Sequence, residues 1–401
     1  MAPKNRIIID TDPGVDDILA ILLALSASPA DVEVLLLSVT FGNVPVQRCL
    51  RNIVAMFNVL EKEFAWRKAH GKALGFDALR ASKPLVAVGA DHPLEEDELA
   101  ADHFHGHDGL HGVHDEHPHL SPEAAWGAAF REGHGERSTP ALFTPSKVAA
   151  HQEILRLLRE SPVNTITIVA VGPLTNLALA AAEEPITFLR VKEVIAMGGT
   201  IDLPGNITPN GEFNIYADPV AAARVFALTS PRPYTSMPVT TAASTLPPYP
   251  DYLSRKLKLT LFPLDITTPH RLFKGPFTEK AKPLEEAGSP LAQWTGHFMS
   301  RTFAKIESLK PSGSTTEAAP ELEDIRVETS GQWTRGMCVV DRRGIKKAVG
   351  LSIEADESAV EELVGDTGGW LGANRGNQIR RVVESPGEDL FGEILLKNIF
   401  G

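Results

Sequence analysis

The chain has 401 residues, of which 43% are hydrophobic and 22% are charged, a composition typical of globular proteins. With 51 acidic and 39 basic residues, its formal net charge is -12. This charge argues against binding to nucleic acids or anionic membranes, because those surfaces are bound by clustered Lys and Arg. We therefore expect a small-molecule ligand.

Cysteine content and the N-terminal segment bear on location. Cys49 and Cys338 are the two cysteines and lie far apart in the sequence, so neither a disulfide framework nor a thiolate metal site is predicted. The apolar run before the first acidic residues is too short for a signal peptide, and no stretch reaches the ~18 apolar residues of a membrane-spanning helix. We predict a cytoplasmic protein.

The first predicted strand, Ile7 to Ile9, leads directly into an acidic segment, and a helix is predicted from Ile18 to Ala27. The segment between them, here called the acidic turn, has four carboxylates within eight residues: Asp10, Asp12, Asp16 and Asp17. Carboxylates packed this closely repel one another, and burial increases the cost unless a cation lies among them. Ligands that are all oxygen favour Ca²⁺ or Mg²⁺ over zinc. Capping of the helix N-terminus is the alternative for Asp16 and Asp17, but it does not account for all four.

Strand and helix signals then alternate. Further strands are predicted at 32–39, 85–88, 165–171 and 191–196, with a helix at 50–60 and a helix started by a proline after residue 171. Continuous apolar strands separated by helices predict a doubly wound, mostly parallel α/β sheet with helices on both faces. We expect a single domain over residues 1–401, with a His-rich insertion at about 92–145 and a shortened linker at about 310–320.

The insertion has eight of the 13 histidines of the chain between His92 and His119. Zinc sites hold four ligands on rigid elements, whereas this segment is predicted to be a long loop with mostly exposed histidines, so zinc is not predicted. His105, which precedes Gly106 and a turn, could reach into a cleft as a proton donor because the pKa of histidine is ordinarily near 6.5.

Two other strand ends have candidate site residues. Asn43 follows Gly42 after the strand 32–39, where it is either a turn residue or, at the same sheet edge as the acidic turn, a ligand contact. At the end of the strand 165–171, the backbone carbonyl of Val171 could bind Ca²⁺, although this turn is mostly structural.

The segment GNITPNGEFNIYADP contains several polar side chains: Asn206, Glu212, Asn214 and Asp218. Asn and Glu supply the donors and acceptors that vicinal hydroxyls require. If the segment is extended, Glu212 and Asn214 share one face and Phe213 points away from it. A polar loop is the alternative, and for Asp218, before Pro219, helix capping is the better interpretation.

The C-terminal part contains a Ser/Thr/Gly/Pro-rich run at 310–320, then strand-like segments at 325–327, 337–340, 348–353 and 379–383, and a closing helix at about 390–399. The strand-like segments are too short to bury a core of their own. We therefore do not divide the chain into domains.

With the motifs DTDPGVDD, FGN, HGxDGL, VGPLTNLALA, MGG and GNxxxxxEFNxxxDP in this order, the chain resembles the inosine-uridine nucleoside hydrolase family, which are calcium-dependent N-ribohydrolases. The match runs from Arg6 to about Phe226 and resumes in FPLDIT, which contains Asp265, and in VETSGQWTRGMCVVDRRG. The His-rich sequence after HGxDGL is similar to that of the fungal branch.

The resemblance implies roles for single residues. Ca²⁺ would be bound by three carboxylates and a backbone carbonyl: Asp12, Asp16, Asp17 and Val171. Asp10 would support the turn, and Asp12 would also be the general base, removing a proton from a Ca²⁺-bound water. The ribose hydroxyls would be held by one aspartate, one glutamate and three asparagines: Asp16, Asn43, Asn206, Glu212 and Asn214.

One family element is missing. Members have an HDP-type segment that completes the calcium site and contacts the base, and here its place is taken by KPSGSTTEAAPELED. Asp265 belongs to an earlier element, and Glu321, Glu323 or Asp324 would have to substitute, although surface exposure is their default interpretation. Fewer carboxylate ligands should weaken metal binding.

The predicted function is hydrolysis of ribonucleosides, purine or pyrimidine, to ribose and free base with Ca²⁺ as cofactor. The resemblance also allows a homo-oligomer. The alternative is a catalytically impaired nucleoside- or ribose-binding protein of the same fold. The junction at residues 310–320 could also reflect an omitted stretch of coding sequence.

Overall fold

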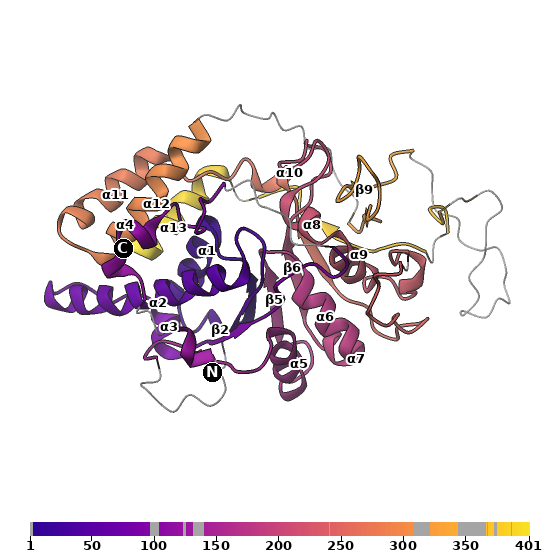
Figure 1. Cartoon of the computed structure of the whole chain (residues 1–401), viewed down its shortest axis with the longest axis horizontal. Coiled ribbons are helices and arrows are strands. Elements are labelled where there is room, and N and C mark those ends of the chain that lie inside the picture. The colour runs from indigo at the N-terminus through magenta and orange to yellow at the C-terminus, as the bar shows by residue number, and fades with distance from the viewer. Residues whose placement is uncertain are drawn as a thin grey trace.

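The computed structural model in Figure 1 describes residues 3–96, 104–122, 126–130, 140–239, 241–307, 321–343, 366, 368–372, 375–385 and 387–401. Eight strands form the central sheet: β1 (Asn5–Thr11), β2 (Val32–Val39), β3 (Leu85–Val88), β4 (Thr144–Pro145), β5 (Ile166–Ala170), β6 (Glu193–Met197), β7 (Leu259–Phe262) and β10 (Arg380–Arg381). A separate antiparallel pair is formed by β8 (Arg326–Val327) and β9 (Cys338–Val339).

All neighbouring strands of the central sheet are parallel, in the order β10-β7-β6-β5-β1-β2-β3-β4. After β1 the chain builds the sheet in one direction through β4, and β5 then returns to the other side of β1. The junction of β1 and β5 is therefore the topological switch point, and ligands of open α/β sheets bind at the carboxyl ends of strands beside such a point. The predicted doubly wound parallel architecture is confirmed.

Helices cover both faces of the sheet and bury two apolar cores (Figure 1). On one side lie α1 (Val15–Ser26), α2 (Val46–Ala69), α3 (Asp77–Ala81), α11 (Lys274–Glu286), α12 (Pro290–Glu307) and α13 (Glu388–Phe400). On the other lie α5 (Ala150–Glu160), α6 (Thr175–Glu183), α7 (Pro185–Phe188) and α9 (Pro219–Ala227). Ile8 and Ile9 of β1 belong to different cores because successive strand residues point to opposite faces.

The predicted elements agree closely with the observed ones in the first half of the chain. The strands predicted at 32–39 and 85–88 have the bounds of β2 and β3, and the strands predicted at 165–171 and 191–196 correspond to β5 and β6. The helix predicted at 50–60 is longer than expected, because α2 begins at Val46 after Pro45 and ends at Ala69. In the C-terminal part, the segments at 325–327, 337–340 and 379–383 contain β8, β9 and β10, and the helix predicted at about 390–399 lies within α13.

Helix α13 joins the last part of the chain to the first. It packs against α1 and α11, and its buried residues Leu395 and Ile399 belong to the core beneath α1. The buried Arg67 of α2 donates to the Ile399 carbonyl at 2.9 Å and pairs with Glu63 at 2.7 Å. Helices from both ends of the sequence therefore belong to the same one of the two apolar cores.

The described part of the His-rich insertion contains regular secondary structure and is not a loop throughout. It contains α4 (Val113–Glu116), the 3₁₀ helices Pro118–Leu120 and Trp126–Phe130, and β4, which pairs with β3. The expectation that its histidines are mostly exposed is wrong for the described residues, because His114 is buried and three are partly buried: His105, His111 and His117. The predicted linker at 310–320 and the strand at 348–353 lie outside the described residues.

Two short helices complete the architecture: α8 (Phe213–Ala217) and α10 (Leu264–Thr267). A further 3₁₀ helix covers Pro233–Thr235. In the part of the chain that the structure describes, none of the helices combines the length and the apolar character needed to cross a membrane.

Candidate active site

The acidic turn begins at the carboxyl end of β1, at the switch point with β5. Asp10, the last but one residue of β1, is fully buried, and its Oδ1 accepts hydrogen bonds from the Ser38 hydroxyl of β2 and from Asn176 Nδ2 of α6 at 2.9 Å. Asp10 thereby connects β1 to β2 and α6. Sequence reasoning missed Asn176, although its place at the start of the helix after β5 could have indicated a contact at this edge.

Asp12 lies at the centre of the turn and is also fully buried. Its Oδ2 accepts the Asn43 backbone N–H at 2.7 Å, whereas its Oδ1 has no hydrogen-bond partner among the described residues. Two glycines leave room for this carboxylate, since a Cβ at Gly42 would lie 2.1 Å from Oδ2 and one at Gly172 would lie 2.6 Å from Oδ1. A buried carboxylate oxygen without a donor is costly, so this oxygen is suited to a cation.

The other two carboxylates of the turn differ from each other. Asp17 is buried and caps α1, because its Oδ2 accepts the Gly14 N–H at 3.2 Å and its Oδ1 accepts the Thr11 hydroxyl at 2.6 Å. The side chain of Asp16 is 63% exposed at the mouth of the turn. The capping alternative is therefore correct for Asp17, but it does not account for Asp10 or Asp12.

Burial without a cation raises the pKa values across the acidic turn. Desolvation is the largest cause in each case: it raises the pKa of Asp10 to about 7, although hydrogen bonds from Ser38 and Asn176 oppose it. Desolvation and then the charge of Asp16 raise the pKa of Asp17 to about 7. Burial and then the charge of Asp17 raise the pKa of Asp12 well above its usual range. Such a site favours a bound cation, which would stabilise the ionised carboxylates.

The residues present fit a hard cation through oxygen ligands. Among the residues that the structure describes, no group of three or more His, Cys, Asp or Glu side chains is arranged as a metal site. The three predicted carboxylate ligands, Asp12, Asp16 and Asp17, are therefore not brought together as such a group. The Asp12 oxygen without a donor is the observation that favours a metal. Oxygen-only ligands are typical of Ca²⁺ and Mg²⁺.

His105 lies against the acidic turn. Its Nδ1 accepts the Val15 N–H at 3.2 Å, and its Nε2 lies 3.7 Å from Asp16 Oδ1. Because Nδ1 accepts, the neutral ring has its proton on Nε2, the nitrogen nearer Asp16. The structure thus brings His105 to the acidic turn, and its role as a proton donor stays a prediction.

Asn43, after β2, and Asn214, in α8, contact the backbone at this edge of the sheet. Asn43 Nδ2 donates to the Asp12 carbonyl at 3.1 Å, which connects the end of β2 to the acidic turn. Asn214 Nδ2 donates to the Val171 carbonyl at 2.8 Å, at the end of β5. The predicted metal-ligand carbonyl therefore already accepts one hydrogen bond, and a carbonyl oxygen has a second lone pair.

The EFN segment is helical, so the assumption of an extended segment is wrong. Glu212 is the N-cap of α8, and its carboxylate accepts the backbone N–H groups of Asn214 at 3.0 Å and Ile215 at 3.1 Å, and that of Gly199 at 2.7 Å. Burial raises the pKa of Glu212. Three backbone donors to one carboxylate override the alternation expected of a strand.

Two neighbouring polar residues differ in burial and role. Asn206 is exposed, and its Oδ1 accepts the Phe213 N–H at 2.9 Å. Asp218 caps α9 by accepting the Ala221 N–H at 2.9 Å, as its position before Pro219 predicted.

The carboxylates considered as substitutes for the missing family aspartate have other partners. Glu323 lies 2.9 Å from Arg381, and Asp324 lies 3.0 Å from Arg326. Asp265 is buried and accepts the N–H groups of Ile201 at 2.9 Å and Asp202 at 2.7 Å. Glu321 is exposed. Surface exposure, the default interpretation, is therefore correct for Glu321 but wrong for Glu323 and Asp324, whose side chains are 14% and 7% exposed.

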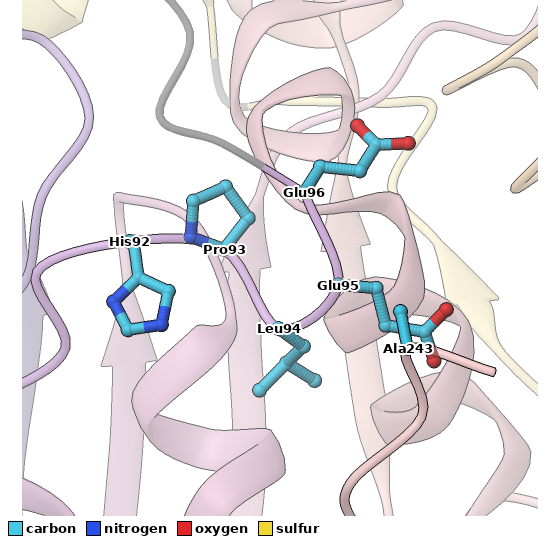
Figure 2. Close-up of a pocket in the computed structure, with 6 residues that line it drawn as sticks. All are labelled: His92, Pro93, Leu94, Glu95, Glu96 and Ala243. Atoms are coloured by element: carbon cyan, nitrogen blue, oxygen red, sulfur yellow. The ribbon is translucent and has the colours of Figure 1, made fainter. Parts of the chain in front are cut away.

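A cavity of about 550 Å³ opens elsewhere, after β3, and none of the predicted site residues lines it (Figure 2). Its two carboxylates already have partners: Glu95 accepts the Thr241 hydroxyl at 2.8 Å, and Glu96 pairs with Arg335 at 3.0 Å. The cavity therefore does not compete with the acidic turn as the candidate site.

Comparisons with known proteins agree with this geometry. Residues 7–362 match the sequence profile of the family described as inosine-uridine preferring nucleoside hydrolase. The chain belongs to this family. It is 32% identical over 362 residues to the pyrimidine-specific ribonucleoside hydrolase RihA of Klebsiella pneumoniae, covering 89% of this chain and 96% of that protein. It is also 36% identical over 234 residues to an uncharacterised protein of Schizosaccharomyces pombe, covering 58% of this chain and 61% of that one.

Solved structures of nucleoside hydrolases share the fold. A purine-preferring ribonucleoside hydrolase from Gardnerella vaginalis superposes with a TM-score of 0.64 at 18% identity, covering 98% of both chains. An inosine-guanosine nucleoside hydrolase has a TM-score of 0.60 at 21% identity, again covering 98% of both chains. The chain is thus an enzyme of the nucleoside hydrolase family, as the sequence motifs predicted.

Proposed function

We propose that this nucleoside hydrolase cleaves the N-glycosidic bond of ribonucleosides with a Ca²⁺-activated water. The observation that carries the proposal is the buried Asp12 Oδ1, which has no hydrogen-bond partner among the described residues and lies at the switch point of the sheet. The relatives differ in preference, since RihA of Klebsiella pneumoniae is named pyrimidine-specific and the Gardnerella vaginalis enzyme purine-preferring. We therefore propose ribonucleosides as the class and leave the base open.

Each predicted residue has a role in this proposal. Ca²⁺ would be held by Asp12, Asp16, Asp17 and the Val171 carbonyl, and when bound it would lower the pKa of a water and bind ribose hydroxyls. Asp12, which a bound cation would keep ionised, would accept a proton from the attacking water.

The remaining residues would hold the sugar and protonate the base. The ribose contacts proposed are Asp16, Asn43, Asn206, Glu212 and Asn214. Cleavage passes through an oxocarbenium-like state, which the surrounding carboxylates stabilise electrostatically. His105 Nε2 is oriented by the Val15 N–H and donates a proton to the departing base. Cytoplasmic location and homo-oligomer formation remain predictions, as does the single domain.

A ribose-binding protein with little turnover is the second candidate. Glu323 and Asp324 are paired with arginines, so the substitutes for the missing HDP-type aspartate are engaged elsewhere. With fewer carboxylate ligands we expect weaker metal binding, since calcium affinity follows ligand charge.

Release of reducing sugar from inosine and uridine tests the proposal. Purified protein with Ca²⁺ should release ribose, and both removal of the metal with EDTA and the Asp12→Asn variant should reduce the rate to background. If wild-type protein releases no more ribose than Asp12→Asn, the hydrolase proposal is wrong. Calorimetric binding of ribose to that inactive protein would then support the second candidate.

A further inference from the structure

A buried asparagine of α2 connects the two halves of the candidate active site. Asn52 is fully buried, and its Nδ2 donates to the Pro13 carbonyl and to the Asp108 carbonyl, each at 2.9 Å. Pro13 belongs to the acidic turn, and Asp108 belongs to the segment His105–His114, here called the histidine loop. One amide group thus joins the backbones of both segments.

The side-chain oxygen of Asn52, Oδ1, also has a partner. His114 Nε2 lies 2.8 Å from Asn52 Oδ1, and His114 Nδ1 lies 2.8 Å from the Ser121 hydroxyl. Because a carbonyl oxygen can only accept, His114 donates from Nε2 and accepts at Nδ1. Desolvation, the largest cause, lowers the pKa of His114 to about 4, and the neutral ring is the form that donates from one nitrogen and accepts at the other.

The histidine loop is internally tied, so its attachment point sets the position of His105. The His111 N–H donates to the His105 carbonyl at 2.9 Å, and Asp108 Oδ1 accepts the N–H groups of Leu110 at 2.9 Å and Gly112 at 2.8 Å. Gly109 has φ +84, and a Cβ there would lie 2.7 Å from Asn52 Nδ2. The loop therefore approaches Asn52 too closely for any residue with a side chain at 109.

From these contacts we infer that Asn52 is a positioning residue of the active site, which holds the histidine loop against the acidic turn so that His105 reaches the reacting nucleoside. This inference rests on the proposed function. Asn52 is too deeply buried to act on substrate itself, and its effect passes through Pro13 and Asp108. A displacement of about 1 Å in such a constellation lowers turnover about 10²-fold.

The chain offers a matched control on the same helix. Asn58 Nδ2 also donates to two backbone carbonyls, those of Leu120 at 2.8 Å and Ser121 at 3.3 Å, beyond the histidine loop. Asn52→Leu and Asn58→Leu therefore remove the same chemistry from α2, but only the first frees the loop from the acidic turn. His114→Gln keeps a donor for Asn52 Oδ1, and His114→Leu removes it.

Steady-state kinetics with inosine and uridine distinguish positioning from stability. For Asn52→Leu we expect kcat to fall about 10²-fold with KM unchanged, because His105 acts on the leaving group in the transition state. Asn58→Leu should keep the wild-type kcat, and His114→Gln should retain more of it than His114→Leu. Equal kcat values for Asn52→Leu, Asn58→Leu and wild type would overturn the inference. If Asn52→Leu fails to fold, Asn52→Asp replaces it in the experiment. The aspartate keeps an acceptor for His114 and removes both amide donors.

Amide hydrogen exchange gives a readout that needs no turnover. Exchange of the amides in residues 105–112 should become about tenfold faster in Asn52→Leu and stay at the wild-type rate in Asn58→Leu. Wild-type exchange in Asn52→Leu would contradict the inference even if the protein proves inactive. Absence of ribose release by the wild type would instead contradict the proposed function, and the exchange result would still decide the role of Asn52.

Discussion

Two regions of the molecule gather acidic residues and treat them differently. At the acidic turn, Asp10 and Asp12 are fully buried, and each has a carboxylate oxygen without a hydrogen-bond partner among the described residues. At the far side of the sheet, beside β10, Asp202 lies 2.6 Å from Arg381 and 2.7 Å from Arg342. Asp202, Glu323 and Asp324, each of which pairs with at least one arginine, are here called the arginine-paired group.

The pKa directions follow this difference. Burial raises the pKa of Asp10 to about 7. Burial also acts to raise the pKa of Asp202, but hydrogen bonds from Arg381 and Arg342 outweigh it, so the pKa lies below its usual value. The arginines neutralise the second cluster, whereas a cation from solution would neutralise the acidic turn in the proposed function.

The largest expected effect comes from exchanging one carboxylate in each region for its amide. Asp12→Asn should lower kcat by about 10³-fold, because it removes the proposed general base. Asp202→Asn should leave kcat unchanged, since its partners Arg381 and Arg342 lie away from the proposed chemistry. Rates of ribose release measure both. Similar losses in the two variants would contradict the comparison.

A methyl group can test the placement of Asp12 without altering its charge. Gly172→Ala puts a Cβ 2.6 Å from Asp12 Oδ1 and should lower kcat/KM about 10²-fold through displacement of that carboxylate. Gly275→Ala, in α11, meets nothing within 4 Å and is the control. Unchanged kinetics in Gly172→Ala would mean that the position of Oδ1 is unimportant.

The stabilisation of the fold by Ca²⁺ should depend on the acidic turn and not on the arginine-paired group. Ca²⁺ at 100 times its Kd should stabilise the wild type by about 2.7 kcal/mol. Asp16→Ala and Asp17→Ala should lose the corresponding rise in Tm, whereas Asp324→Asn, in the arginine-paired group, should keep it. Thermal unfolding with Ca²⁺ and with EDTA measures this rise. An equal rise in Asp16→Ala and Asp17→Ala would move the metal site elsewhere.

The smallest expected effect is on pH dependence in EDTA. The pKa of Asp10 is raised to about 7 in the folded protein, so its contribution to stability is present below pH ~4 and is lost as pH rises towards 7. Asp202, with a lowered pKa, has the opposite sign and loses its contribution as pH falls through its folded pKa. Urea unfolding from pH 4 to 8 should show a shallower decline in Asp10→Asn. An identical decline in wild type and Asp10→Asn would contradict the raised pKa.

The sequence predicted the sheet well because its strands are continuous apolar runs. The predicted range 32–39 has the same bounds as β2, and β1 extends two residues beyond the predicted Ile9, so that Asp10 lies within the strand and the other three aspartates follow it. It failed at the EFN segment, because the capping of α8 by Glu212 depends on the distant Gly199 loop as well as on local N–H groups. The sequence analysis also missed Asn52 and Asn176, whose partners lie in other elements. The place of Asn176 at the start of a helix was a signal, whereas Asn52 in the middle of α2 has no local signal.

The packing of α13 on α1 has a consequence for biosynthesis. The apolar face of α1 is covered by Leu395 and Ile399, which the ribosome adds long after α1 has left the exit tunnel. Until α13 is synthesised, this apolar face of α1 lacks its native contacts with α13. Exposed apolar surface of this kind is bound by chaperones and promotes aggregation. Such distant pairing also slows folding, since contacts between remote residues form late.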